Sequence, residues 1–352
     1  MQDVGTNIIK EGSTYVQSTA TKDYAYSTLD AQTQEVYNQI VYAIEKRRTQ
    51  VRLATKSIAV MEQACQAVRY DHCEYFWLES FSYVTHKKDD EIRAIYFSPE
   101  FSMTKKEQEQ VQAEIDSSVS DLLSEAPAEG SDFDKALYVY RSLIENVDYN
   151  PEAEDSQNII STFINGETVC QGYAYGMQYL LEQLGLSCTT VEGSAGGEAH
   201  AWNLVCMDGA YYYVDTTWGN SQYVSAAEDA DGSIEKYIDF NFFGMTTEEI
   251  EQTHTLSEGI SLPECTATEN NYFIHEGVYF DRWDAETIGD CLRQIYENGD
   301  CEAQLKFSDA DLFEQMVQTF LDEGQIRDYC TDMNRVAYLE LDRECTLLLL
   351  FE

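Results

Sequence analysis

The sequence predicts an α+β fold, and three observations lead to this prediction. Apolar side chains recur at helical spacing directly after Cys170. The dipeptide Asp208-Gly209 lies between two segments of alternating apolar and polar residues, which predicts an antiparallel hairpin. Both flanks of this central part carry further helix-like and strand-like segments. With 352 residues and 43% apolar side chains, the chain is large enough for two or three structural units.

Charge and cysteine content narrow the function classes. The formal net charge is −42, from 64 acidic and 22 basic side chains, which argues against a nucleic-acid partner and against charge-driven binding to anionic membranes. The excess of acidic side chains is expected to keep the protein soluble. The alternative role for this charge is to attract cationic peptides or basic wall components. The ten cysteines form no C-x-x-C pair, which disfavours a zinc ribbon or a thioredoxin-type site.

The remaining cysteines and the two chain ends give weaker signals. If Cys170 is a free thiol, nine cysteines remain, and an odd number cannot pair completely within one chain. Most are expected to be buried thiols, and the alternative is that one or two disulfides form among them. The start of the chain shows no leader-like segment, and the longest apolar run, residues 347–351, is too short to span a bilayer.

Residues 1–126 are predicted to form a mostly helical region that contains one β-hairpin. Residues 1–27 are polar and are expected to be extended or irregular. The stretch 126–131 is the best boundary signal, because its proline and glycine interrupt regular structure. Ser131 or Asp132 is expected to cap the helix that follows. The predicted helices of this region cover 29–48, 56–70 and 104–125, and its predicted strands cover 74–85 and 91–98.

Cys170 is the candidate nucleophile, because it lies at or just before the start of a helix. The thiolate is the reactive form of cysteine, and both the positive end of a helix and an adjacent imidazole favour it. The unpaired amides of the first turn could also hydrogen-bond an oxyanion. Gly172 is small enough for a substrate to approach the backbone, and Gln171 is a candidate for the oxyanion site. Taken alone, Cys170 would be interpreted as a buried structural thiol.

His200 and Asp215 are the candidate base and the carboxylate that orients it. If Asp208-Gly209 forms a two-residue turn, the register places Trp202 opposite Asp215. Residues two apart share a face, so His200 is a diagonal neighbour of Asp215, with Cβ atoms roughly 7 Å apart or less. A one-residue slip would place His200 on the opposite face. A packing histidine and a strand-end cap are the alternatives for each residue alone. Together with Cys170 they follow the order nucleophile, base and orienter.

The segment from about Phe133 to Trp218 contains four motifs, at residues 132–137, 166–174, 200–203 and 214–218. Together they resemble the transglutaminase-like core, a papain-like fold. The resemblance implies that the helix carrying the cysteine packs on an antiparallel sheet carrying the histidine and the aspartate. It assigns nucleophile, base and acid to Cys170, His200 and Asp215. Families with this core include cross-linking enzymes, peptidases and deglycosylating amidases, so the fold alone does not name the reaction.

The flanks of this core resemble, more loosely, multi-part surface proteins of Gram-positive bacteria. That resemblance implies an extracellular or cell-surface location after removal of a leader absent from this chain. The core is predicted to span 127–265, with an acidic surface loop at 228–232 near the site. Residues 266–352 are predicted to form a small α+β domain. Its predicted strands cover 272–280 and 302–307, its helices 284–298 and 309–322, and its hairpin 335–351.

The predicted function is cysteine-dependent acyl transfer on peptide or protein amides. Hydrolysis by a peptidase or amidase is favoured, because no feature defines a channel for an acceptor amine. A protein cross-linking transglutaminase is one alternative, and a non-catalytic surface-binding or scaffolding protein that keeps the fold is another. The expected partner is a peptide or protein substrate, with cell-wall material as one option.

No cofactor and no metal are expected. A metal site made of Cys170, His200 and Asp215 would lack a fourth ligand at a recognisable spacing, and no calcium-binding spacing of oxygen ligands is present. Trp202 and Trp218 are candidate walls of a substrate cleft, although packing around the hairpin is at least equally expected for both.

Overall fold

The computed structural model describes residues 23–224, 234–257 and 259–351. It divides into two compact units. The first comprises Met1–Ile238 and Thr246–Thr266, and the second comprises Asp239–Met245 and Ala267–Glu352. The predicted boundary after residue 126 lies inside the first unit, and the three-region division of the sequence stays a prediction. The predicted loop at 228–232 and residues 1–22 lie outside the described residues.

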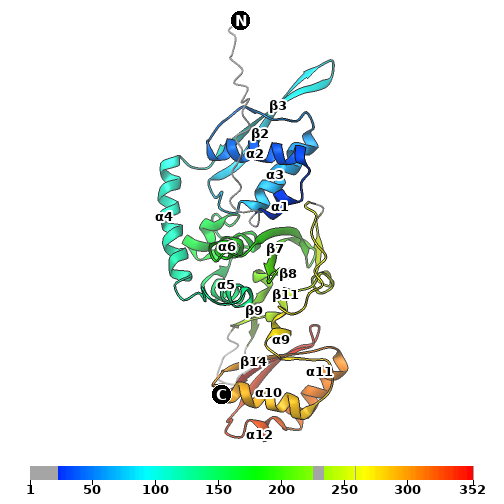
Figure 1. Cartoon of the computed structure of the whole chain (residues 1–352). Helices are drawn as coiled ribbons and strands as arrows, with labels where there is room; N and C mark the ends of the chain where they lie inside the picture. Colours follow the sequence, from blue (N-terminus) through cyan, green and yellow to red (C-terminus); the bar gives the residue numbers. More distant parts are fainter. Residues whose placement is uncertain (1–22, 225–233, 258, 352) are drawn as a thin grey trace. The chain divides into compact units, whose positions relative to one another are not determined.

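The N-terminal part of the first unit contains helices and a long β-hairpin (Figure 1). The three predicted helices and the hairpin are confirmed, with ends shifted by a few residues. Each long helix starts where a polar side chain accepts a backbone N–H of the first turn: Asp30, Ser57 and Thr104 do so. The helices are α1 (Tyr24–Ser27), α2 (Ala31–Glu45), α3 (Ile58–Asp71) and α4 (Lys105–Leu122), and the strands are β1 (Val51–Arg52), β2 (Leu78–Lys88) and β3 (Glu91–Phe101) in the order β1-β3-β2.

Two helices form the helical side of the core. Helix α5 (Asp132–Asn146) begins at the predicted cap, where Ser131 and Asp134 form a capping box. Helix α6 (Cys170–Gln183) packs beside it (Figure 1). The predicted apolar face of α6 is confirmed, because Tyr173, Met177, Leu180 and Leu181 are fully buried. Between the two helices lie β4 (Asp148–Tyr149), a π-helical turn (Ser161–Asn165) and β5 (Glu167–Thr168), which pairs with β4.

The sheet side of the core is antiparallel. Within the first unit its strands run in the order β8-β7-β6-β12. The predicted hairpin register is confirmed: Met207 pairs with Ala210 and Asn203 with Val214. Asp208 and Gly209 have φ of 52° and 83°, as a tight two-residue turn requires. The strands are β6 (Cys188–Ala195), β7 (Glu198–Met207), β8 (Ala210–Val214) and β12 (His254–Leu256), and α7 (Thr216–Gly219), β9 (Asn220–Val224), β10 (Ile234–Ile238) and α8 (Thr247–Ile250) complete the unit.

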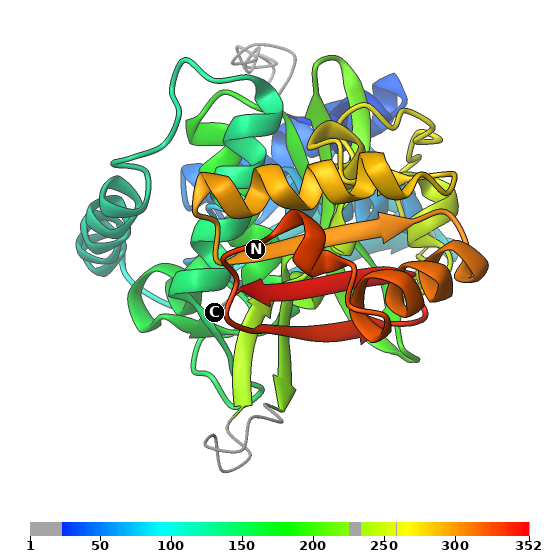
Figure 2. The ribbon, with the colours of Figure 1, turned by 90° about the horizontal axis from the view of Figure 1, so that it is seen from below.

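The second unit contains its own sheet and apolar core. The predicted helix at 284–298, strand at 302–307 and hairpin at 335–351 are confirmed. The helix α10 (Ala285–Asn298) lies along the sheet (Figure 2), and the core joins its buried side chains to those of the strands. The strand order is β13-β14-β16-β15. The remaining elements are a 3-10 turn (Phe240–Phe242), β11 (Phe243–Met245), α9 (Tyr272–His275), β13 (Tyr279–Phe280), β14 (Glu302–Phe307), α11 (Ala310–Met316), a π-helical turn (Val317–Asp322), α12 (Ile326–Tyr329), β15 (Val336–Leu341) and β16 (Thr346–Phe351).

One strand prediction in this unit is wrong. Residues 272–280 form a helical turn, α9, followed by the two-residue strand β13. Asn271 caps the turn by accepting the N–H of Phe273, and Gly277, with φ of 72°, ends it. These local backbone contacts outweigh the strand-like composition. Among the described helices, none combines the length and the apolarity needed to cross a membrane.

Candidate active site

Cys170 occupies the first position of α6, as predicted. The preceding residue, Val169, offers no side chain to cap the helix. The first-turn amides therefore have no partner within the helix and no capping group, and they favour a negative charge at this point. Cys170 is partly exposed, whereas Cys65, Cys73 and Cys188 are buried. A partly exposed thiol at a helix N-terminus has the setting of a reactive cysteine.

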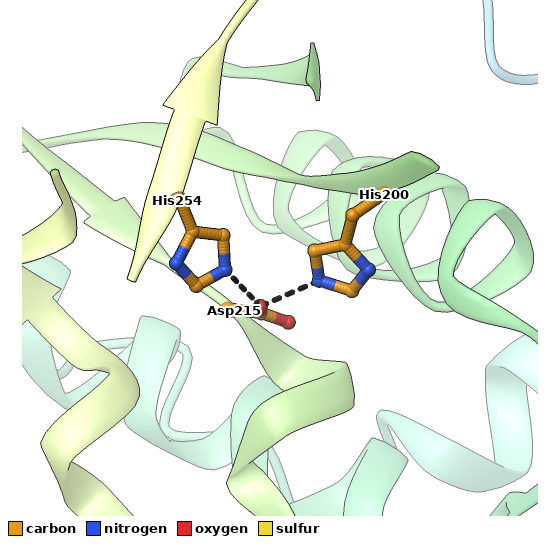
Figure 3. Close-up of side chains that lie close together, drawn as sticks. All are labelled: His200, Asp215 and His254. Carbon is orange, nitrogen blue, oxygen red and sulfur yellow. Dashed lines mark hydrogen bonds and ion pairs between the residues drawn. The ribbon is translucent and has the colours of Figure 1, made fainter. Parts of the chain in front are cut away.

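His200 links Cys170 to Asp215. Its Nε2 lies 2.7 Å from Oδ2 of Asp215 (Figure 3). Cys170 interacts with the same imidazole and contributes to raising its pKa. Because Nε2 contacts the carboxylate, Nδ1 is the ring nitrogen left for the sulfur. The structure thus brings together the three residues that the sequence singled out, from a helix start, a strand and the end of the neighbouring strand.

Asp215 is completely buried and caps a helix as well. Its Oδ1 accepts the backbone N–H groups of Thr217 at 2.9 Å and Trp218 at 3.1 Å. Its Oδ2 faces His200. The two interpretations of this residue, a cap and an orienter, therefore hold at once, because its two oxygens have different partners. The backbone contacts fix the plane of the carboxylate that the imidazole meets.

The ion pair shifts the pKa values of both partners. Burial works to lower the pKa of His200, but the charge of Asp215 and the hydrogen-bonding interactions with Asp215 and Cys170 raise it from 6.5 to about 10. Burial works to raise the pKa of Asp215, but the charge of His200 and hydrogen bonds from His200 and His254 lower it from 3.8 to about 2. Near neutral pH the site therefore favours an imidazolium beside an ionised carboxylate.

These shifts predict how stability depends on pH. The raised pKa of His200 stabilises the folded state fully below pH 6.5 and is lost as pH rises towards 10. The lowered pKa of Asp215 stabilises the folded state above pH 3.8 and is lost as pH falls towards 2. We expect the melting temperature of the wild type to fall more steeply between pH 6.5 and 10 than that of His200→Gln. Identical profiles for the two proteins would refute the ion pair.

The four secondary site residues have mixed surroundings. Gln171 is 7% exposed, and its Nε2 has no hydrogen-bond partner among the described residues. A Cβ on Gly172 would lie 1.8 Å from Oγ1 of Thr168, so internal packing already requires glycine here. Trp202 is 1% exposed, and its ring stacks on His200 at 5.8 Å. Trp218 lies 6.3 Å from the same imidazole. Substrate contacts by these residues stay predictions.

His254 is the site residue that the sequence did not single out. It lies on β12, and its Nε2 is 2.9 Å from the same Oδ2 of Asp215 that His200 contacts (Figure 3). Its side chain has no exposed surface. In the sequence, His254 is an isolated histidine that follows a capped turn. Its strand β12 pairs with β6, which lies far away in the sequence, so no local pattern indicates that His254 reaches Asp215. Such a signal is more typical of a packing residue.

His200, Asp215 and His254 also form the one metal-competent group among the described residues, with donor atoms within 4.8 Å of one another. The 2.7 and 2.9 Å separations from Oδ2 to the two Nε2 atoms are those of N–H···O hydrogen bonds. A hydrogen on each Nε2 occupies the lone pair that a metal would need. Hydrogen bonding is therefore the better interpretation of the group.

Residues 122–216 match the model of the transglutaminase-like superfamily. This segment is a transglutaminase-like core. It contains Cys170, His200 and Asp215 but not His254. The rest of the chain lies outside the match.

Curated relatives and solved structures also resemble parts of the chain. Kyphoscoliosis peptidase of Mus musculus is 32% identical over 127 residues, which are 31% of this chain and 19% of the relative. The Homo sapiens protein of the same name is 32% identical over 123 residues, 30% of this chain and 18% of the relative. The chain thus spans about a fifth of the length of these relatives.

Among solved structures, a TGase has a TM-score of 0.30 and 16% identity, covering 44% of this chain and 48% of that one. A protein from Cytophaga hutchinsonii, described as a candidate cysteine protease, has a TM-score of 0.27 and 13% identity. That match covers 46% of this chain and 70% of the other.

Proposed function

We propose that the chain is a cysteine-dependent acyl-transfer enzyme that hydrolyses peptide or protein amides. The observation that carries this proposal is that Cys170 and Asp215 both interact with His200, whose Nε2 lies 2.7 Å from Oδ2 of Asp215. These are the roles of nucleophile, base and orienter that acyl transfer requires. The partly exposed thiol at an uncapped helix start supplies an attacking group that a substrate can reach.

Each step follows from the chemistry of these groups. The Cys170 thiolate attacks the amide carbonyl carbon, and the carbonyl oxygen becomes an oxyanion. First-turn amides of α6 are the donors for that charge, and we propose that the Nε2 of Gln171, which has no hydrogen-bond partner among the described residues, adds a further one. The imidazolium of His200 gives its proton to the leaving nitrogen, so the C–N bond breaks and a thioester remains. Water then attacks the thioester, His200 takes up its proton, and the acid is released as the thiol re-forms.

Transfer to a lysine amine instead of water is the second candidate, and the superfamily name supports it. Hydrolysis is supported by the name of both curated relatives, kyphoscoliosis peptidase. We also propose that the substrate is an extracellular or cell-surface peptide or protein. The loose resemblance of the flanks to surface proteins supports this. A net charge of −42 would attract a cationic peptide wherever the protein acts.

One assay separates the candidates. Wild type and Cys170→Ala are incubated with an unfolded protein mixture, and separately with purified cell wall, in the presence of a tagged primary amine. We expect new peptide termini from wild type alone, with little amine incorporated. Dominant incorporation of the amine would establish a cross-linking enzyme. Retention of the protein on cell wall with neither product would favour a binding protein that keeps the fold.

A further inference from the structure

Two histidines contact one oxygen of the candidate triad. The carboxylate Oδ2 of Asp215 lies 2.7 Å from Nε2 of His200 and 2.9 Å from Nε2 of His254. In Figure 3 the two rings approach Asp215 from different strands, and both point towards it. Neither Asp215 nor the His254 side chain has exposed surface. Acyl transfer by Cys170 requires only one imidazole, so the second one calls for an explanation.

The hydrogen-bond network fixes the tautomer of His254. An ionised carboxylate can only accept, so we assign a hydrogen to Nε2, which donates to Asp215. The other ring nitrogen, Nδ1, lies 2.6 Å from Oγ1 of Thr253. The Thr253 hydroxyl donates to Nδ1, because its other contact, to the carbonyl of Ile250, is longer at 3.4 Å. In this assignment each ring nitrogen of His254 has one partner: Nε2 donates to Asp215, and Nδ1 accepts from Thr253.

The strand register builds this contact into the sheet. His254 pairs with Ala195 on β6, and Ala195 pairs with Glu198 on β7. Paired residues share a face, and so do residues two apart, which places His254 on the face of His200. Gly193, opposite His200, allows the β12 backbone and the Trp202 ring to lie close to β6. A Cβ there would lie 2.1 Å from the carbonyl oxygen of Thr255 on β12 and 2.7 Å from the Trp202 ring.

We propose that His254 is a positioning residue that holds the Asp215 carboxylate in the orientation that aims His200 at Cys170. The inference rests on the proposed function, because it assigns a role within that acyl-transfer centre. Asp215 has two backbone donors on Oδ1 and two imidazole donors on Oδ2, so its plane is fixed from both ends. Without the His254 donor the carboxylate keeps only His200 on Oδ2. The orientation of that imidazole is then no longer set independently of the sulfur.

Packing alone gives a different expectation for the same residue. The His254 ring lies 4.9 Å from the ring of Trp202 and 4.8 Å from that of Trp218. A phenylalanine would preserve these aromatic contacts and lose the donor. A glutamine would lose the ring and keep an amide N–H near the position of Nε2. Which of the two variants is more active therefore separates a hydrogen-bonding role from a packing role.

The experiment compares His254→Phe and His254→Gln with wild type. Three measurements are made for each protein. The first is kcat and KM on a peptide that wild type cleaves in the assay above. The second is the rate at which iodoacetamide alkylates Cys170, followed by mass spectrometry of its peptide, and the third is the melting temperature. For His254→Phe we expect kcat and the alkylation rate to fall by about 30- to 100-fold with little change in KM, the size of effect that a misplaced catalytic group produces. We expect His254→Gln to recover to within about fivefold of wild type.

Substitutions at Thr253 provide a second test. They are expected to disturb the fold less than substitutions at His254, because Thr253 is partly exposed. Thr253→Val removes the hydroxyl that fixes the tautomer, and Thr253→Ser keeps it. We expect the valine variant to alkylate about three- to tenfold more slowly than wild type, and the serine variant to match wild type. If both His254 variants fail to fold, this pair decides: equal alkylation rates for the valine and serine variants overturn the proposal.

Other outcomes would also overturn it. One is a His254→Phe protein as active as wild type, or more active than His254→Gln at similar melting temperature. Another is one tightly bound metal ion per wild-type chain that His254→Gln loses, because Nε2 would then be a ligand and not a donor. Alkylation does not depend on the substrate. If wild type hydrolyses nothing but Cys170 labelling still depends on the His254 donor, the proposed function fails and the positioning role stands.

Discussion

Alanine in place of Cys170 is expected to abolish amide turnover. In the mechanism above the sulfur forms the bond that divides the reaction into two steps, and no neighbouring group can take over that role. Loss of the nucleophile in a triad removes most of the catalytic advantage, so we expect a decrease in kcat of about 10⁴-fold or more. The measurement is the hydrolysis rate on a peptide that wild type cleaves in the assay described above, with the melting temperature as a check on folding.

Cys206→Ala is the matched control for this substitution. Cys206 is also partly exposed, but it lies near the hairpin end of β7, away from His200. We expect the control to keep the wild-type rate. Undiminished turnover in Cys170→Ala, or an equal loss in both variants, would show that Cys170 is not the nucleophile.

Asparagine in place of Asp215 is expected to reduce kcat by about 10⁴-fold, as a comparable change does in a serine protease triad. The side-chain oxygen can still accept the backbone N–H groups of Thr217 and Trp218, so the fold should survive. The amide nitrogen, however, now faces Nε2 of His200 and can only donate to it. The hydrogen of a neutral His200 then moves to Nδ1, the nitrogen that faces Cys170, and the ring can no longer accept the thiol proton.

The control for this change is Asp116→Asn on α4, which removes an exposed carboxylate far along the chain from the site. It should leave kcat unchanged. The pH profile of Cys170 alkylation gives a second readout, because loss of the Asp215 charge removes the main cause that raises the pKa of His200. An Asp215→Asn enzyme within tenfold of wild type would show that the carboxylate only caps α7.

The sequence was sufficient for those parts of the site that local rules determine. The turn residues Asp208 and Gly209 set the hairpin register, and that register brings His200 beside Asp215. The apolar spacing after Cys170 set the start of α6. In both cases the deciding interactions lie within a few residues of one another, so turn chemistry and periodicity are enough to predict them.

The role of His254 could not be predicted in this way. Its strand has three residues and pairs with β6 without a connecting turn, so no local pattern indicates the register. The burial of Trp202 has the same origin, since its environment comes from His254 and Gly193 on other strands. The helical turn α9 was missed because the cap by Asn271 outweighs strand-like composition.

Competition among the ten cysteines for a limiting amount of iodoacetamide at neutral pH tests the active-site assignment most directly. Mass spectrometry of the digested protein identifies which thiol reacts first, in wild type and in His200→Ala. If the His200 imidazolium stabilises a thiolate at Cys170, Cys170 is modified well before the exposed Cys301. This preference is then expected to disappear in His200→Ala. Labelling of Cys170 no faster than Cys301, or unchanged by His200→Ala, would contradict it.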